Sequence, residues 1–564
     1  MMPSRTDKAG VLLDLLLVIL LLAAGSGVRW LHVRAVLFPP LDDPAFYLIT
    51  GQNLASGRGL TIDALWSYSL PFPGVTHPSH EHWMPLTTGL IAAALTVQRA
   101  LSPQTAPSLL AGQLPGLMLG TLLVPLTYIV GRKSLPGGRE NRRVAFMAAL
   151  SVALSATLSY QSASADSSAP FALLAAWALA TAVHPPGEKG SYLGTGLLVA
   201  LAFLTRNDGL LLLLTIPLAW WLLPIPAAFR PRPVELPDNP AARTVWELWE
   251  RERGAQAQGA AVRISGPGLS SLLDVVVIFL LVTAPWLVRN YLAFGTPLPG
   301  SVLSQAWLSD YVQTFNFLDH PTWQSLVNQG WQAILAQRGQ ALAHNGAVFL
   351  LITFPWGLLA LPGLWLLRHE WPFYPPLLYG LLLFFVSALL FPVSAMSGTF
   401  YHSLGAVVPF LALAAMYAVQ RAAQRLSRKR ALPLFVILAL GLTVLAGGQV
   451  VQALPRVAER HRAEKEQFEA IAAWLAHHAA PGEVVMTTQP YTLHYVSGHP
   501  CIVLPAGEPP DAAWQAARRY GARFLIITQT FGQYPHILHD QPDARFRLLQ
   551  ADKTAEIYEI DLAR

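Results

Sequence analysis

The apolar stretch Val11-Leu-Leu-Asp-Leu-Leu-Leu-Val-Ile-Leu-Leu-Leu-Ala-Ala-Gly-Ser-Gly-Val28 decides the class of fold, because its only charge is Asp14. A helix needs about 20 apolar residues to cross a hydrocarbon core of about 30 Å. Arg5 and Lys8 precede the run as in a signal peptide, but we interpret it as an uncleaved first span with a cytoplasmic N-terminus. Similar runs recur, and we predict about eleven spans, near 11–28, 108–131, 144–163, 169–184, 192–206, 209–224, 271–288, 346–367, 372–391, 403–420 and 431–450.

The composition agrees with a membrane protein. Of the 564 residues, 53% are hydrophobic and 12% are charged, whereas roughly 25% are charged in an average soluble domain. The net charge of +6 is scattered over short loops and forms no basic face interleaved with aromatic residues, so we predict no nucleic-acid partner. The single cysteine, Cys501, excludes an intramolecular disulfide and a site of several cysteine ligands. We predict a polytopic α-helical membrane protein.

The orientation in the membrane depends on whether the apolar segment Met84–Leu101 is a span. If it lies on the outer surface as a helix, twenty Lys and Arg residues fall on inner segments and seven on outer loops. The opposite choice would place the densest basic clusters, 132–143 and 421–430, outside, against the positive-inside rule. We therefore predict a transmembrane domain over 1–450, with a first outer loop carrying surface helices at 29–107 and a cytoplasmic loop at 225–270.

The last part of the chain is more polar and alternates between helix and strand patterns. We predict helices at 456–478 and 511–520 and strands at 484–486, 501–504 and 524–528. Strands that alternate with helices are typical of a mainly parallel sheet. We therefore predict a small soluble α/β domain over 451–564, on the extracytoplasmic side of the membrane.

Two adjacent acids, Asp42 and Asp43, stand in the stretch Val36-Leu-Phe-Pro-Pro-Leu-Asp-Asp-Pro-Ala-Phe-Tyr47, shortly after the first span. Pro44 favours a helix that starts at this proline, and Asp43 would then be its N-cap. A cap needs only one acid, so Asp42 has no evident local structural task. We predict that at least one of the pair takes part in chemistry, and Asp42 is the first choice.

Motifs farther along the chain share the predicted outer side with this acid pair. They are Asn53-Leu-Ala-Ser-Gly-Arg-Gly59, His77-Pro-Ser-His-Glu-His-Trp-Met-Pro-Leu86, Asp166, Thr205-Arg-Asn-Asp-Gly209, Ala284-Pro-Trp-Leu-Val-Arg-Asn-Tyr291 and Phe400-Tyr-His402. With these motifs, residues 11 to 450 resemble the GT-C glycosyltransferases, integral-membrane enzymes that include the protein O-mannosyltransferases and the lipid A aminoarabinose transferase. Members of that superfamily typically carry an acidic pair at the start of the first outer loop, and Asp42-Asp43 match it.

The resemblance implies transfer of a sugar from a polyprenyl-phosphate donor to an acceptor at the outer face of a prokaryotic cytoplasmic membrane, with inversion at the anomeric carbon. The acceptor would be a protein, a lipid or a glycan. An acceptor hydroxyl is a weak nucleophile at neutral pH, so a carboxylate is needed as general base. Asp42 would act as this base, and Asp43 would orient it or hold a metal.

The leaving phosphate needs fixed cations, and arginine meets phosphate oxygens bidentately. Arg206 and Arg289, each near the outer end of a predicted span, are candidates; the alternative is that they are ordinary interfacial arginines. Asp166 would pair with one of them, bind the acceptor, or cap the next helix. Related enzymes commonly have an Arg-Tyr pair near a late span, where this chain has Tyr401 and His402, so a phosphate contact there is less strongly supported.

His77, His80, Glu81 and His82 crowd into six positions and could hold a divalent metal, although interfacial or substrate-lining roles suit the pattern better. Glu81 and His82 are candidates for sugar contact, and no cofactor is firmly predicted. The alternative function is a transporter, a flippase or a non-catalytic binding subunit for polyprenyl-linked glycans. A transporter should carry ionisable residues inside its spans, and these are scarce here.

Overall fold

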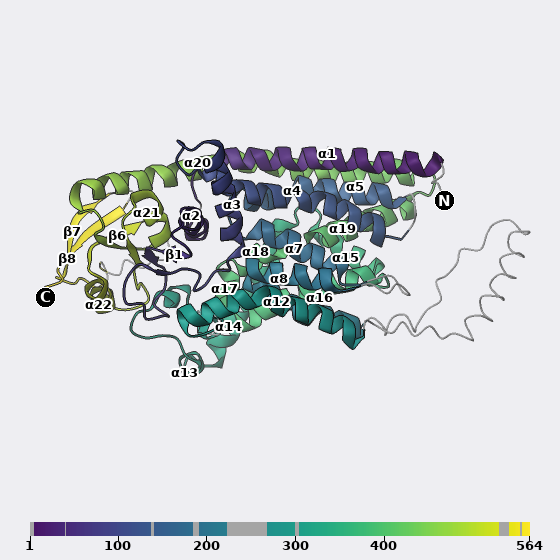
Figure 1. Ribbon diagram of the computed structural model, residues 1–564. Coiled ribbons are helices and arrows are strands. Elements are labelled where there is room, and N and C mark those ends of the chain that lie inside the picture. The colour runs from purple at the N-terminus through teal and green to yellow at the C-terminus, as the bar shows by residue number, and fades with distance from the viewer. Residues whose placement is uncertain are drawn as a thin grey trace, which may run out of the picture.

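The computed structural model describes residues 5–39, 41–136, 140–183, 191–222, 268–298, 304–528, 538, 541–552 and 555–563. Long helices lie side by side in an elongated bundle, and a small sheet with its covering helices lies at one end (Figure 1). The two chain termini lie at opposite ends of the molecule.

Among the described residues, five helices are long and apolar enough to cross a membrane. They are α1 (Arg5–Ala35), α4 (Leu109–Ser134), α12 (Leu269–Phe294), α16 (Tyr374–Leu390) and α20 (Ala431–His478). Three bent pairs raise the count to eight if each pair is one span: α5 (Glu140–Ala153) with α6 (Ala156–Ala163), α14 (Trp331–Ile352) with α15 (Gly357–Leu366), and α18 (Thr399–Ser403) with α19 (Val408–Leu426). The multi-pass membrane architecture is confirmed, and the count of about eleven spans stays a prediction.

Shorter helices complete the bundle and the end that carries the sheet. They are α2 (Asp42–Ala55), α3 (Leu86–Leu101), α7 (Ser168–Thr181), α8 (Leu193–Thr205), α9 (Leu210–Leu222), α13 (Trp323–Val327), α17 (Pro392–Met396), α21 (Pro490–Ser497) and α22 (Pro510–Tyr520). The predicted surface helix at Met84–Leu101 corresponds to α3. The predicted cytoplasmic loop at 225–270 lies almost entirely outside the described residues.

The predicted span at 346–367 is not one straight helix. Helices α14 and α15 meet there at a bend of 93°. Pro355 lies in the bend and has no N–H to continue the helix. A Cβ on Gly357 would lie 1.9 Å from Oγ1 of Thr353, so the turn closes too tightly for any side chain at that position. Hydropathy indicates how long an apolar run is, but it does not indicate a bend between two helices within that run.

The sheet has six strands, in the order β2 (Ala64–Leu65), β5 (Cys501–Val503), β4 (Val484–Thr487), β6 (Ala522–Thr528), β8 (Ala555–Ile560) and β7 (Phe546–Ala551). The first four are mutually parallel, and the last two are added antiparallel. Strand β2 comes from the predicted first outer loop, where β1 (Thr61–Ile62) and β3 (His77–Pro78) also form an antiparallel pair. The first loop and the C-terminal region therefore share one sheet.

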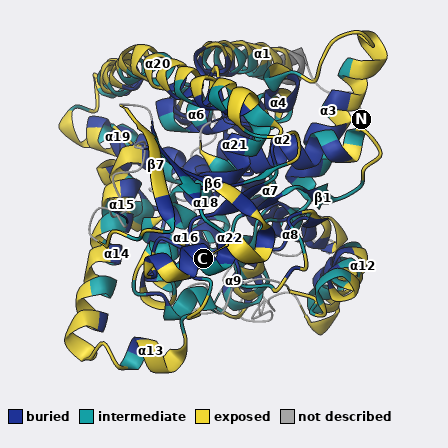
Figure 2. Ribbon diagram, turned by 90° about the vertical axis from the view of Figure 1, so that its left-hand side faces the viewer, coloured by how far each residue is buried: buried dark blue, intermediate teal, exposed yellow. Residues whose placement is uncertain are grey.

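Helix α20 joins the bundle to the sheet. The predicted span at 431–450 and the predicted helix at 456–478 form one continuous helix of 48 residues, with Pro455 inside it. Phe468 near its C-terminal end stacks on Phe38, which follows α1. Viewed from the sheet end, the centre is buried, whereas α1, α12, α14 and α20 carry exposed faces at the periphery (Figure 2). Exposed apolar side chains such as Leu281 and Leu292 on α12 suit contact with lipid.

Candidate active site

The acid pair lies in the first turn of α2, which begins at Asp42 itself. The residue before it, Leu41, has φ 64° and makes no side-chain cap. The expectation that Asp43 caps a helix starting at Pro44 is therefore wrong. Neighbouring side chains on a helix point about 100° apart, so the two carboxylates reach different partners.

Asp42 contacts the first turn of α21 in the C-terminal region. Its Oδ1 accepts hydrogen bonds from the backbone N–H and the hydroxyl of Thr492, both at 3.0 Å. The N-cap residue of α21, Gln489, makes no side-chain cap, so Asp42 supplies the missing acceptor from another part of the chain. Burial raises the pKa of Asp42 to about 7, although the bonds from Thr492 oppose the rise. The view that Asp42 lacks a structural task is thus overturned, and its proposed role as base stays a prediction.

Asp43 points toward a different set of groups. Burial raises its pKa, and repulsion from Asp166 raises it further, while the positive charges of His402 and Arg206 oppose the rise. The indole of Trp83 also hydrogen-bonds its carboxylate. The structure therefore places Asp43 close enough to Asp166, His402 and Arg206 to interact with them electrostatically. The sequence motifs singled out all three.

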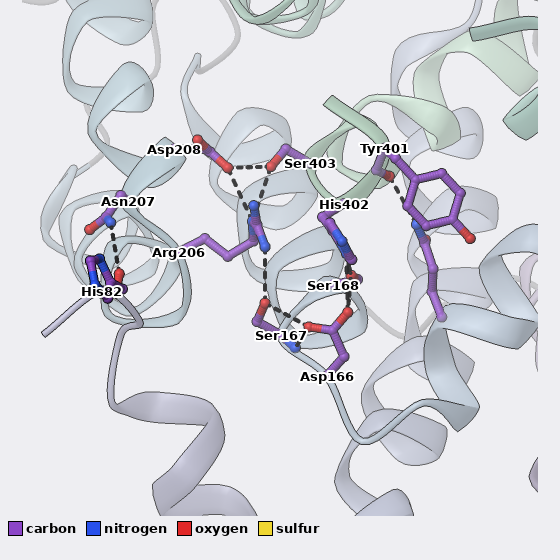
Figure 3. Close-up of polar contacts among 11 residues, drawn as sticks. His82, Asp166, Ser167, Ser168, Arg206, Asn207, Asp208, Tyr401, His402 and Ser403 are labelled. Carbon is purple, nitrogen blue, oxygen red and sulfur yellow. Dashed lines mark hydrogen bonds and ion pairs between the residues drawn. The ribbon is translucent and has the colours of Figure 1, made fainter. Parts of the chain in front are cut away.

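These three residues belong to one polar network (Figure 3). Asp166, just before α7, is 5% exposed and lies 3.0 Å from Nδ1 of His402. Its carboxylate also accepts hydrogen bonds from the hydroxyls of Ser167 at 2.9 Å and Ser168 at 3.0 Å. Burial favours a raised pKa for Asp166, but His402 and then Arg206 outweigh it and hold the pKa below its usual range. Asp166 is therefore ionised at neutral pH.

Arg206 follows α8 and is held on three sides. Its Nε donates to Asp208 at 3.0 Å and to the Ser403 hydroxyl at 3.1 Å, and Nη1 donates to the Ser167 hydroxyl at 3.1 Å. Tyr47 of α2 also reaches Ser167. An arginine fixed among helices in this way differs from the snorkelling interfacial arginine considered above.

Tyr401 and His402 have different surroundings despite their adjacency. His402 contacts Asp166 and, at 2.7 Å, the Ser168 hydroxyl. The backbone carbonyl of Tyr401 accepts a hydrogen bond from Gln161, and Figure 3 shows its ring directed away from the network. The structure brings His402, and not the Tyr401 ring, to the candidate site.

Glu81 and Arg289 form a second group at the same end of the bundle. Glu81 is buried, lies 3.6 Å from Nε2 of His77 and accepts a hydrogen bond from the Tyr491 hydroxyl at 3.3 Å. Burial favours a raised pKa for Glu81, but His77 outweighs it and the pKa falls to about 2. The Arg289 guanidinium lies 5.0 Å from the rings of both Trp286 and Phe294 and interacts electrostatically with Glu81. Its guanidinium donates hydrogen bonds to the Asn290 side chain at 3.2 Å and to the Leu60 carbonyl at 3.3 Å.

His82 lies between the two groups. Its carbonyl accepts a hydrogen bond from Asn207 at 3.4 Å, and its ring packs edge-on against Trp66 and Trp83. Within the described ranges, no three His, Cys, Asp or Glu side chains are grouped as metal ligands. The interfacial or substrate-lining role that the sequence favours for these histidines stays a prediction.

Four partners were missed from the sequence: Ser167, Ser168 and Ser403 in the network, and Thr492, which binds Asp42. Asp208 stood in the motif Thr205–Gly209 but was given no role there. The polar run Ser162-Ala-Ser-Ala-Asp-Ser-Ser168 between two apolar segments was the available signal for Ser167 and Ser168. No local pattern pointed to Ser403 or Thr492.

The resemblance to the GT-C glycosyltransferases is confirmed at the level of the fold, because the helical bundle with a sheet at one end is similar to solved structures of ArnT and AglB. ArnT from Cupriavidus metallidurans, bound to undecaprenyl phosphate, matches with a TM-score of 0.53 and 13% identity, over 96% of this chain and 97% of that one. The archaeal oligosaccharyltransferase AglB from Archaeoglobus fulgidus, in complex with an inhibitory peptide and a dolichol-phosphate, matches with a TM-score of 0.52 and 12% identity, over 93% and 70%. No family model and no curated protein matches the sequence.

Proposed function

We propose that this protein is a glycosyltransferase that moves a sugar from a polyprenyl-phosphate donor to an acceptor hydroxyl. The observation that carries the proposal is the convergence of Asp43, Asp166, His402 and Arg206 at one end of a GT-C fold. Two proteins of this fold hold undecaprenyl phosphate and dolichol-phosphate, which supports a lipid phosphate as the carrier here.

Asp43 is the general base in this proposal. It takes the proton of the acceptor hydroxyl as that oxygen attacks the anomeric carbon, and the bond between this carbon and the phosphate oxygen breaks on the opposite side. The anomeric centre is inverted, and the polyprenyl phosphate leaves with the electron pair. Burial raises the pKa of Asp43, and a carboxylate of higher pKa accepts a proton more readily.

Arg206 stabilises the leaving phosphate. Asp208, Ser403 and Ser167 hold its guanidinium in place before the substrate arrives, and fixed charges in a poorly screened site cost no reorganisation during the reaction. Asp166 lies 3.0 Å from Nδ1 of His402 and orients this ring next to Arg206. Arg289 and Glu81 then contact the acceptor or the sugar from the neighbouring group.

The site lies on the outer face of a prokaryotic cytoplasmic membrane in this proposal. The distribution of basic residues supports a cytoplasmic N-terminus. The sheet lies at the opposite end of the molecule from that terminus, so this orientation places the sheet and the acid pair outside (Figure 1).

The test is the release of undecaprenyl phosphate, measured by mass spectrometry, from a panel of undecaprenyl-phosphate pentoses and hexoses. The full-length protein in nanodiscs is supplied with host envelope extract as acceptor. Asp43→Asn should lower the release rate by about 10²-fold or more, the usual contribution of a general base. Arg206→Gln should also weaken binding of undecaprenyl phosphate itself. Asp63→Asn is the matched control, since Asp63 lies in the same loop but pairs with Arg58.

Two outcomes would contradict the proposal. One is full release by the Asp43→Asn variant, which would remove this residue from the base role and return attention to Asp42. The other is the absence of release from every donor together with movement of the intact donor across a proteoliposome membrane. That second outcome would favour the flippase.

A further inference from the structure

Helix α21 contacts two acids of the first loop, Asp42 and Glu81, although it lies more than 400 positions away in the sequence. Its Thr492 binds Asp42 through two hydrogen bonds, and its Tyr491 donates to Glu81. The helix follows β4 and precedes β5, the strand that pairs with β2 of the same first loop. The contacts thus lie where the two parts of the chain share a sheet.

We propose that α21 is part of the active site and that Thr492 is a positioning residue, which fixes the catalytic acid of α2 through Asp42. The inference rests on the proposed function. Asp42 and Asp43 are consecutive in the first turn of α2, so any rotation or fraying of this turn moves both carboxylates together. An anchor on Asp42 therefore sets the direction of Asp43.

The first turn of α2 needs such an anchor. Leu41, which precedes it, has a positive φ that a leucine rarely adopts, and such a conformation persists only where surrounding contacts enforce it. No side chain caps α2 at this end. The two bonds from Thr492 to Oδ1 of Asp42 are contacts of the required kind, because they join this turn to another helix through both the backbone N–H and the hydroxyl of Thr492.

A second route from α21 reaches Asp43 through aromatic side chains. The Tyr491 ring lies 5.2 Å from Phe46 of α2 and 5.5 Å from Trp83. Phe46 and Trp83 stack at 4.5 Å, and the Trp83 indole hydrogen-bonds Asp43. Thr492 and Tyr491 are neighbours in α21, so a shift of this helix would change both the hydrogen bonds to Asp42 and the aromatic contacts that lead to Asp43.

The test compares Thr492→Val, which removes the hydroxyl donor at constant size, with Thr492→Ser, which keeps it. The matched control is Thr528→Val, because Thr528 is also buried in the C-terminal region but bonds Thr488 and Gln489 and not Asp42. With the full-length protein and the undecaprenyl-phosphate sugars above, Thr492→Val should lower kcat about tenfold with the donor KM within twofold. Thr492→Ser should restore kcat, and Thr528→Val should change neither constant.

The proposal is overturned if Thr492→Val keeps the wild-type kcat, or if Thr528→Val loses as much, since the loss would then reflect general destabilisation. If the wild type releases no undecaprenyl phosphate, the proposed function fails and the positioning contact is tested by amide hydrogen exchange. Thr492→Val should then accelerate exchange in residues 45–48 of α2 while Thr528→Val does not. Equal exchange in both variants would overturn it.

Discussion

Replacement of Asp42 by Asn should raise the stability of the protein at alkaline pH and leave it nearly unchanged at acid pH. Burial raises the pKa of Asp42 from its ordinary value of 3.8 to about 7, so the folded protein binds this proton more tightly than the unfolded chain. The wild type is then most stable, as far as this group is concerned, below about pH 4 and loses stability as pH rises to about 7. Asn has a similar shape, accepts the Thr492 bonds and does not titrate.

The size of the effect follows from the pKa shift. A difference of about three units corresponds to about 4 kcal/mol at 1.36 kcal/mol per unit. Asp42 keeps part of its surface exposed, and solvent screening reduces the penalty, so we expect about half of that value at pH 8. In a chain of this length, about 2 kcal/mol is a rise in Tm of about 2 °C.

The assay is thermal unfolding in detergent, followed by tryptophan fluorescence from pH 5 to pH 8 for the wild type and Asp42→Asn. The difference in Tm should grow with pH. Asp63→Asn is the control of opposite sign, because hydrogen bonds from Thr76 and Arg58 overcome burial and lower the pKa of Asp63, so this variant should be less stable than the wild type throughout. If the difference for Asp42→Asn is flat or shrinks with pH, the hydrogen bonds from Thr492 outweigh burial and the reasoning fails.

Two further substitutions probe the surroundings of the site. Asp166→Asn should lower stability by about 1–3 kcal/mol, because it removes the buried carboxylate that lies 3.0 Å from His402 and accepts hydrogen bonds from Ser167 and Ser168; an unchanged Tm in thermal unfolding would contradict this. Gly120→Ala should cost about 1–3 kcal/mol, since its Cβ would lie 2.1 Å from the Ser162 hydroxyl between α4 and α6. The same thermal measurement should show a smaller loss when Ser162 is also replaced by Gly.

Much of the helical architecture could be predicted from the sequence, because apolar runs report which segments avoid water. The run at 11–28 lies within α1, and the run at 209–224 corresponds closely to α9. The bend at 353–357 could not be read in this way, because it depends on a steric fit between Thr353 and Gly357. Strand β2 has two residues, too few for a local pattern, and exists because its partner β5 lies elsewhere in the chain.

The sequence singled out several charged residues that the structure brings close together, but it did not indicate which residues they contact. Charged residues are costly in an apolar chain, so Asp43, Asp166 and Arg206 stood out by type and position. Their hydrogen-bond partners did not stand out, because capping patterns relate only residues that are close in the sequence. Pro44 favours Asp43 as a helix cap. The structure instead joins Asp42 by a hydrogen bond to Thr492, 450 positions away, and leaves Asp43 facing the polar network.

Backbone strain explains why local rules fail at these acids in particular. In the described part of the chain, the three non-glycine residues with positive φ are Leu41, His80 and Ala165, and they directly precede Asp42, Glu81 and Asp166. Each such conformation costs about 1–3 kcal/mol and persists only where tertiary contacts compensate. For these acids the compensating contacts include bonds from α21 and from His402, which come from distant parts of the chain. The acids are therefore placed by the assembled fold, and the C-terminal region takes part in placing two of the three.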